Sequence, residues 1–183
     1  MANKTTAAKP KIGGAVYVAP AGTTLPTDAT TALDSAFKSL GYISDSGLVN
    51  SNTLSSNTVK AWGGDEVLDI SEGRSDSFKY TLLDATSAEV LKEVFGDENV
   101  TVDEETGTIT VKSKSSIEMP EKVYVIEMIL KNNALKRITI PNGKVTTVGD
   151  VTYSDSAAVG YETTLKATAD TEGNTHYEYI KTA

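Results

Sequence analysis

Residues 122–131, with the sequence KVYVIEMILK, constrain the fold of this chain more than any other segment. Apolar side chains fill one face of the strand expected here and most of the other, with Tyr124, Ile126, Met128 and Leu130 on the first face and Val123, Val125 and Ile129 on the second. A strand with apolar residues on both faces must be covered on both sides. We therefore predict a central strand, with a helix or a neighbouring chain over its second face.

Most of the remaining chain also predicts strands, because apolar and polar residues alternate with a period of two. The clearest segments are residues 78–83, 108–114, 137–141, 161–169 and 175–181. Turn signals separate them at residues 106–107, 132–133, 142–143 and 172–174, and Asn142-Gly143 is the strongest because both residues tolerate the positive φ of a type I′ turn. Strands that follow one another through short turns favour antiparallel pairing.

Two segments predict short helices, residues 31–40 and 86–95. Each begins with a capping pattern, carries one apolar stripe and ends at a glycine, Gly41 or Gly96. The predicted fold is mainly β: an antiparallel β-sandwich or barrel of about nine to ten strands, with one or two short helices packed on it. We expect a single domain over residues 13–183 and a flexible N-terminal arm over residues 1–12.

A polar loop or hairpin near residues 42–64 has little hydrophobic face of its own. Such a hairpin is poorly stabilised in a monomer, so we expect a partner to order it. Its apolar residues are candidate contacts with another copy: Leu48, Val49, Leu54 and Trp62. Trp62, the only tryptophan, is typical of an anchor on another protein surface, and local packing is the alternative.

Charge is unevenly distributed along a chain whose formal net charge is −8. Residues 62–107 hold thirteen acidic and three basic side chains, whereas residues 108–144 hold seven basic and three acidic ones. The arm carries Lys4, Lys9 and Lys11 and no acid, and these lysines are further candidate contacts. The blocks are either complementary surfaces on neighbouring copies or solvated faces without a partner.

Several kinds of chemistry are excluded by composition. The chain has no cysteine and one histidine, so a disulfide, a thiol nucleophile and a multi-histidine metal site are all excluded. His176 has no orienting partner nearby in the sequence and is expected to pack or lie at the surface. The acids of residues 97–103 lack the spacing of a calcium loop. We predict no catalytic residue, no cofactor and no metal.

The same features bear on location and ligands. No apolar run approaches 18 residues, and the N-terminus lacks the apolar stretch of a signal peptide. We expect no membrane association and synthesis in the cytoplasm. The negative charge disfavours specific binding of nucleic acid, whose affinity comes largely from lysine and arginine.

Over residues 13–102 the chain resembles the major tail proteins, or tail tube proteins, of long-tailed, siphovirus-type bacteriophages of Gram-positive hosts. The matching motifs are GGAVYVAPAGTTLP, then LGYISDSG, then VKAWGGDEV, and then DSFKYTLLDATSAEVLKEVFGDENV. The resemblance implies a structural subunit that forms hexameric rings, which stack into a hollow conduit for genome delivery. It also implies a virion location, contacts through the arm and the polar hairpin, and tail initiator, terminator and tape-measure proteins as partners.

DNA would pass through such a tube without specific binding, because acidic side chains facing the lumen repel phosphates. Asp65 and Asp69 are candidates for this face, together with Ser71, on the expectation that Leu68 and Ile70 face the core. Two other functions stay open at this point. One is a soluble β-sandwich binding module, an adhesin or virion decoration that recognises carbohydrate or a cell surface through Trp62 or the pair Tyr177 and Tyr179. The other is a hydrolase with a carboxylate pair.

Overall fold

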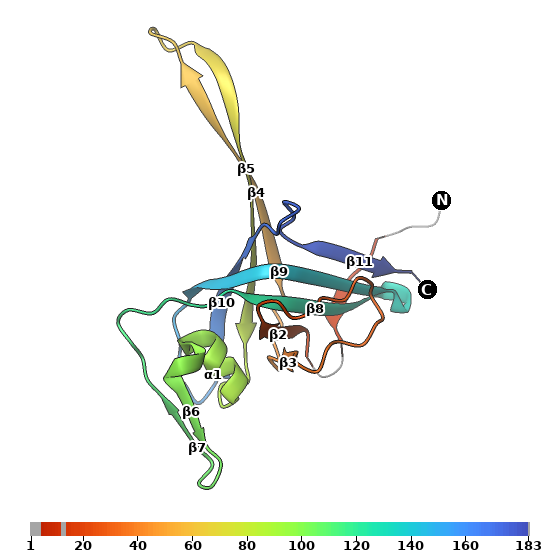
Figure 1. Ribbon diagram of the computed structural model, residues 1–183, viewed down its shortest axis with the longest axis vertical. Helices are drawn as coiled ribbons and strands as arrows, with labels where there is room; N and C mark the ends of the chain where they lie inside the picture. The colour runs from red at the N-terminus through yellow and green to blue at the C-terminus, as the bar shows by residue number, and fades with distance from the viewer. Residues whose placement is uncertain (1–4, 12–13, 183) are drawn as a thin grey trace.

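The computed structural model describes residues 5–11 and 14–182, and it is built around one nine-stranded antiparallel sheet (Figure 1). The path of the sheet is β3-β2-β8-β9-β10-β5-β4, while β1 adds to β8 and β11 adds to β9. The bounds are β1 Ala8–Pro10, β2 Val16–Pro20, β3 Lys38–Ser39, β4 Val49–Lys60, β5 Glu66–Leu82, β8 Lys122–Leu130, β9 Leu135–Val148, β10 Tyr161–Thr168 and β11 Tyr177–Lys181. The predicted mainly β, antiparallel fold is confirmed.

The smaller elements lie between β5 and β8 in the sequence. They are the helix α1 (Ala88–Phe95), a 3₁₀ turn (Asp97–Asn99) and the two-stranded sheet of β6 (Val100–Asp103) and β7 (Thr108–Val111). A second 3₁₀ turn (Lys131–Asn133) joins β8 to β9. In the part of the chain that the structure describes, no helix is long and apolar enough to cross a membrane.

The strand β8 is buried on both faces, as predicted. Tyr124 and Ile126 belong to the main core, whereas Val123 and Val125 belong to a second, smaller cluster on the opposite face. Residues 21–37 cover that second face. The cover is an irregular segment of the same chain rather than the predicted helix or neighbouring chain.

The predicted helix over residues 31–40 is wrong, because its apolar stripe serves two faces of the sheet. Phe37 packs in the second cluster, but Leu40 packs in the main core, and one side of a helix cannot reach both. The chain instead crosses the sheet edge as β3. Asp28 fixes the preceding turn by accepting hydrogen bonds from the Thr30 and Thr31 backbone N–H groups at 2.5 and 2.6 Å.

A buried ion pair holds this irregular segment on the sheet. Glu127 and Arg137 lie directly opposite each other on β8 and β9, and the Arg137 guanidinium donates to the Glu127 carboxylate through Nε and Nη2. Arg137 Nη1 donates to the carbonyl oxygen of Asp28 at 2.8 Å. Because Arg137 is almost fully buried and presents its donors in a rigid fork, it fixes both the strand pair and the loop above it.

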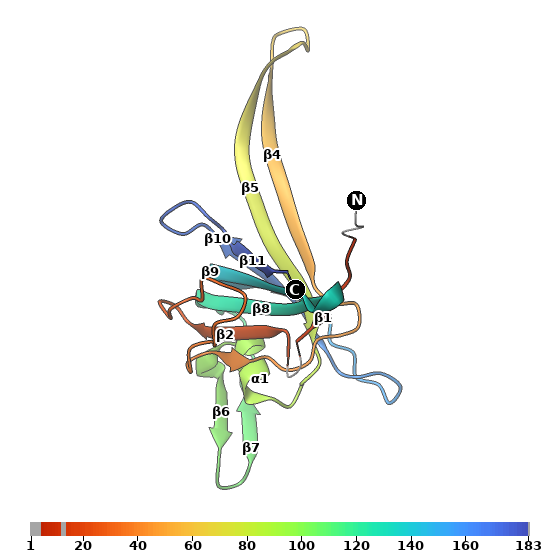
Figure 2. The ribbon, with the colours of Figure 1, turned by 90° about the vertical axis from the view of Figure 1, so that its right-hand side faces the viewer.

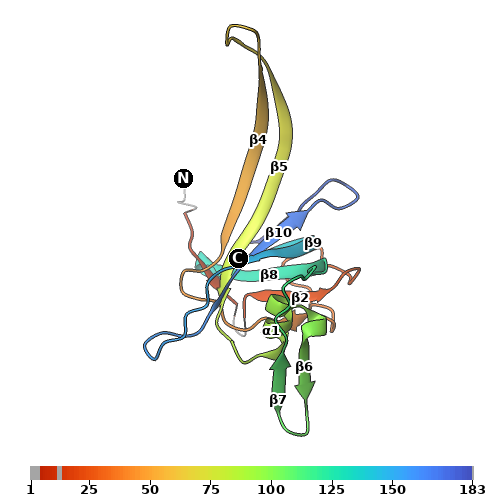
Figure 3. The same ribbon diagram turned by 90° about the vertical axis from the view of Figure 1, so that its left-hand side faces the viewer.

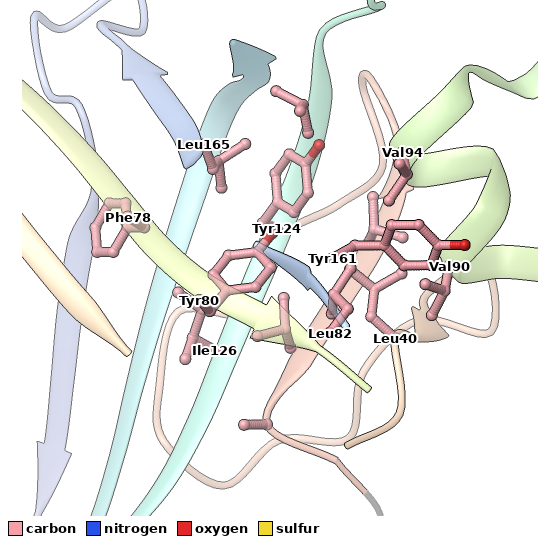
Figure 4. Close-up of a cluster of buried hydrophobic side chains, with 14 of the residues drawn as sticks. Leu40, Phe78, Tyr80, Leu82, Val90, Val94, Tyr124, Ile126, Tyr161 and Leu165 are labelled. Carbon is pink, nitrogen blue, oxygen red and sulfur yellow. The ribbon is translucent and has the colours of Figure 1, made fainter. Parts of the chain in front are cut away.

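The second predicted helix is present as α1, and Gly96 ends it with a φ of 88°. The capping pattern predicted to begin at Thr86 is wrong. Ser87 occupies the N-cap position, and its side chain makes no capping hydrogen bond. The buried face of α1 places Val90, Leu91 and Val94 on the main core. Figure 4 shows Val90 and Val94 facing the aromatic and aliphatic side chains of the sheet.

The sheet curls around this core until its two ends meet. An isolated bridge joins Ile43, just after β3, to Leu82 at the end of β5. Hydrogen bonds from Ser44 N to Thr81 O and from Leu83 N to Tyr42 O flank the bridge, each at 2.9 Å. The core therefore lies inside a partly closed, barrel-like sheet, with α1 packed against it.

The turn predicted at Asn142-Gly143 is wrong, because both residues lie inside the continuous strand β9. In the described chain, the non-glycine residues with positive φ are Asn132 and Asn133, at 63° and 59°, which form the turn between β8 and β9. Gly143 has a packing role instead. A Cβ atom at this position would lie 2.6 Å from the ring of Tyr124 and 3.0 Å from Leu165.

We expect Gly143→Ala to lower the free energy of unfolding by about 1–3 kcal/mol, because the added methyl group overpacks a closed core. Urea denaturation of the purified variant measures this change. The same substitution beside Tyr124→Leu should cost clearly less, since the smaller side chain vacates the ring position. An equal cost in both backgrounds would contradict the steric explanation.

Candidate functional site

The hairpin of β4 and β5 is the largest feature that the core does not explain. The two strands pair from Val49↔Lys79 to Lys60↔Glu66, and every residue from 49 to 75 is exposed. Figures 2 and 3 show it extending far beyond the body of the molecule. The ten residues 66–75 span roughly 30 Å at about 3.3 Å per residue. For comparison, a compact chain of 183 residues has a radius of gyration of about 16 Å.

The outer part of the hairpin has one apolar and one polar face. The pairs Asn57↔Ile70 and Val59↔Leu68 place three aliphatic side chains on one face, because directly opposed residues lie on the same side of a two-stranded ribbon. The pairs Thr58↔Asp69 and Ser56↔Ser71 form the other face. We call the side chains of Val59, Leu68 and Ile70 the apolar face of the hairpin.

Asp69 and Ser71 thus share a face, as predicted, but the expectation that Leu68 and Ile70 face the core is wrong. Their side chains are 56% and 46% exposed. No other element of the described chain covers the outer hairpin, so its apolar face has no partner. The sequence did not reveal that this face is uncovered. The alternation of apolar and polar residues shows which side chains share a face of a strand, but it does not show whether another element packs against that face.

The tip of the hairpin presents Trp62 to solvent. Ala61 N donates to Asp65 O at 2.8 Å and Gly64 N donates to Ala61 O at 3.0 Å, which closes the turn. The indole of Trp62 is fully exposed. Local packing, the alternative explanation for this residue, is therefore absent among the described side chains. Asp65 lies in this turn, just before β5 begins at Glu66, rather than on the strand face with Asp69 and Ser71 where it was expected.

The other predicted contact residues are dispersed. Val49 and Leu54 are exposed but lie on opposite faces of β4, and Leu48 is half-buried against the main core. Lys9 is exposed in β1, which pairs with β8 of the same chain. Lys11 forms an ion pair with Glu127 at 2.8 Å. Lys4 lies outside the described residues.

A buried polar contact marks the point where the hairpin leaves the body. Asp76 is fully buried, and its Oδ2 accepts a hydrogen bond from the hydroxyl of Thr175 and lies 3.7 Å from Nδ1 of His176. The His176 ring meets Phe78 edge-on, with centroids 5.4 Å apart. Thr175 and His176, which precede β11, therefore pack against Asp76 and Phe78 of β5, at the point where the hairpin leaves the body.

The pair Tyr177 and Tyr179, proposed above for a ligand site, lies in the same region. The Tyr177 hydroxyl donates to Asp170 at 2.6 Å, and this bond raises the pKa of Tyr177 and lowers that of Asp170. Its polar group is thus engaged in its own loop.

A second buried polar cluster joins α1 to β8. The carboxylate of Glu93 accepts hydrogen bonds from the Tyr124 hydroxyl at 2.6 Å and from Lys122 Nζ at 3.2 Å, and Lys122 also reaches Asp97 at 2.9 Å. Burial raises the pKa of Glu93, and the favourable contacts with Lys122 and Tyr124 do not offset it. Burial opposes the charge of Lys122, but Glu93 and Asp97 together raise its pKa.

The chemistry of this cluster is structural. Burial, followed by the charge of Glu93, raises the pKa of Tyr124 well above 10, so its hydroxyl stays a hydrogen-bond donor. The side chain of Glu93 is almost completely enclosed, which leaves no room for a substrate against it. Among residues 5–11 and 14–182, no group of three or more histidine, aspartate or glutamate side chains could hold a metal ion.

We expect the stability of the Glu93→Gln variant relative to wild type to increase as pH rises above 4.5, the ordinary pKa of glutamate. Above pH 4.5 the side chain of Glu93 loses its proton in the unfolded chain but keeps it in the native protein, where its pKa is raised. The free energy of unfolding of the wild type therefore falls as pH rises through this range. Glutamine does not titrate, so the variant does not show this fall. Urea denaturation at several pH values measures the difference. Glu89→Gln, at the edge of the same helix, is the matched control, and a Glu93→Gln difference that falls with pH would contradict the raised pKa.

Comparison with known proteins adds a family to these observations. A search of curated proteins found none that matches the chain. The family model described as "Phage tail tube protein" matches residues 1–183, the whole sequence. Together with the β-rich fold and an uncovered hairpin, this match shows that the chain belongs to the phage tail tube protein family.

Proposed function

We propose that this protein is the subunit of a phage tail tube, in which hexameric rings stack into a hollow conduit for genome delivery. The observation that carries the proposal is the hairpin of β4 and β5. A two-stranded hairpin without a covered face is marginally stable in water. The hairpin here exposes a tryptophan and an aliphatic face, so burial against other copies would stabilise it.

The edge of the sheet supports self-assembly in the same way. Within the described chain, the outer edge of β4 pairs with no other strand along its twelve residues. Exposed strand edges readily pair with another chain. In the proposed tube, neighbouring copies contact these strand edges and the N-terminal arm with Lys4, Lys9 and Lys11. They also contact the hairpin through Val49, Leu54 and Trp62, with Leu48 at its base.

The polar face of the hairpin fits the wall of a passage for DNA. Asp69 on that face and Asp65 in the turn would face the lumen and repel phosphates, so that the genome slides without specific binding. The protein would have no catalytic role, no cofactor and no membrane contact. Its partners would be further copies of itself and the tail initiator, terminator and tape-measure proteins, in a virion assembled in the cytoplasm of the host bacterium.

Truncation of the hairpin tests the proposal. Replacing residues 54–74 by Asn-Gly joins the paired residues Thr53 and Ser75 through a two-residue turn. We expect a folded monomer with an unfolding free energy within about 1 kcal/mol of wild type, because the removed residues are exposed. We also expect it to form no tubes. Circular dichroism with urea denaturation and negative-stain electron microscopy over a concentration series measure both results.

Single substitutions at the tip sharpen this test. Trp62→Ala should raise the concentration needed for tubes, and Trp62→Phe, which keeps an aromatic ring, should do so less. Tube formation by the truncated variant at the wild-type concentration would overturn the role of the hairpin. A wild-type protein that stays monomeric at every concentration, with hairpin amides protected from exchange, would overturn the proposed function.

A further inference from the structure

A groove of about 540 Å³ opens on the side of the sheet where α1 lies. It runs between the C-terminal end of α1, residues 113–119 and residues 144–148 of β9. Its apolar lining consists of Val94, Phe95, Ile117, Met119, Val145 and Val148. Ile117 is 44% exposed at the rim. The groove thus offers a partly uncovered apolar floor that continues the main core.

The charges around the groove are mostly positive. Lys114 and Lys144 line it, and the acid among its lining residues, Glu118, reaches Lys144 at 3.4 Å with its own side chain largely in solvent. The outer hairpin has the opposite charge. Residues 60–72 carry one lysine against four acids, which are Asp65, Glu66, Asp69 and Glu72. An apolar strip with acidic flanks therefore matches an apolar groove with a basic rim.

The hairpin cannot fill the groove of its own chain. Figures 1 and 3 show the hairpin and α1 extending to opposite sides of the main sheet. The hairpin is long enough to reach another copy, because its outer part spans roughly 30 Å. Two complementary surfaces at opposite ends of one molecule make a heterologous contact that repeats from copy to copy.

We propose that the apolar face of the hairpin, Val59, Leu68 and Ile70, docks in this groove of a second copy. The inference rests on the proposed function and assigns the surface that receives the hairpin. In the contact, aliphatic side chains of the hairpin cover Ile117 and Met119, while Glu72, the unpaired residue at the irregularity in β5, approaches Lys114 and Lys144. The polar face with Asp69 then points away from the groove and stays free to line the lumen.

Crosslinking between copies tests the contact directly, since the chain has no cysteine of its own. One variant carries Ile70→Cys and another carries Ile117→Cys, and the two are mixed, assembled and treated with a short bismaleimide. We expect covalent dimers of the two variants. A chain that carries both substitutions should give a ladder of dimers, trimers and larger species, because each copy has both ends of the contact.

The matched control replaces Ile117→Cys by Val102→Cys. Val102 is similarly exposed, at 43%, and lies on β6 outside the groove. Tubes that crosslink through residue 102 and not through residue 117, or through neither, would overturn the docking site and leave the proposed function intact. A wild-type chain that stays monomeric at every concentration, with hairpin amides protected from exchange, would overturn both.

Charge reversal provides a second test, independent of the cysteine variants. Lys114→Glu with Lys144→Glu should raise the concentration needed for tubes about tenfold, and Glu72→Lys should raise it as well. Combining the three changes in one chain should restore assembly toward the wild-type level, because opposite charges meet again. Defects that simply add in the combined variant would overturn the contact, and circular dichroism of each monomer verifies that it is folded.

Discussion

The rest of the structure depends on one strand, β8, whose residues 122–127 are buried on both faces. Its main-chain groups pair with β1, β2 and β9, and its side chains supply both cores. Covering both faces requires two different layers: α1 on one side and an irregular segment on the other. The Glu127–Arg137 pair ties the second layer to the sheet, because Arg137 also donates to the Asp28 carbonyl. The polar cluster of Glu93, Lys122 and Tyr124 ties α1 to the same strand.

The hairpin is the part of the sheet that lies beyond this double cover. Asp76 marks the boundary, since it is buried while residues 66–75 are exposed. Inside the boundary, Phe78, Tyr80 and Leu82 point into the core, and outside it the same strand has only β4 beside it. Membership of the tail tube protein family offers an explanation for this exposed part of β5, because neighbouring copies in an assembly can cover the apolar face that the monomer leaves exposed. The ordering of the hairpin and the joining of copies would then be one process.

Alternation along the sequence located most strands, because a half-buried strand imposes a period of two on its residues. It failed where a segment serves two surfaces at once. Leu33, Phe37 and Leu40 have helical spacing, yet Phe37 and Leu40 pack on opposite faces of the sheet. It also misread Gly143, which has turn-forming chemistry but is a glycine because the Tyr124 ring occupies the space of a side chain. Both errors come from contacts between residues distant in the chain.

The sequence by itself determined the mainly β class, the central strand in residues 122–131, the polar character of residues 42–64 and the absence of thiol and multi-histidine chemistry. These properties follow from composition and local periodicity, which need no knowledge of neighbours. Only the tertiary structure decided that Leu68 and Ile70 face solvent, that Thr175 and His176 pack against the buried Asp76 at the root of the hairpin, and that a basic-rimmed groove lies at the opposite end from an acidic hairpin. Exposure and complementarity are relations between distant segments, and they exist only once the sheet has brought those segments into place.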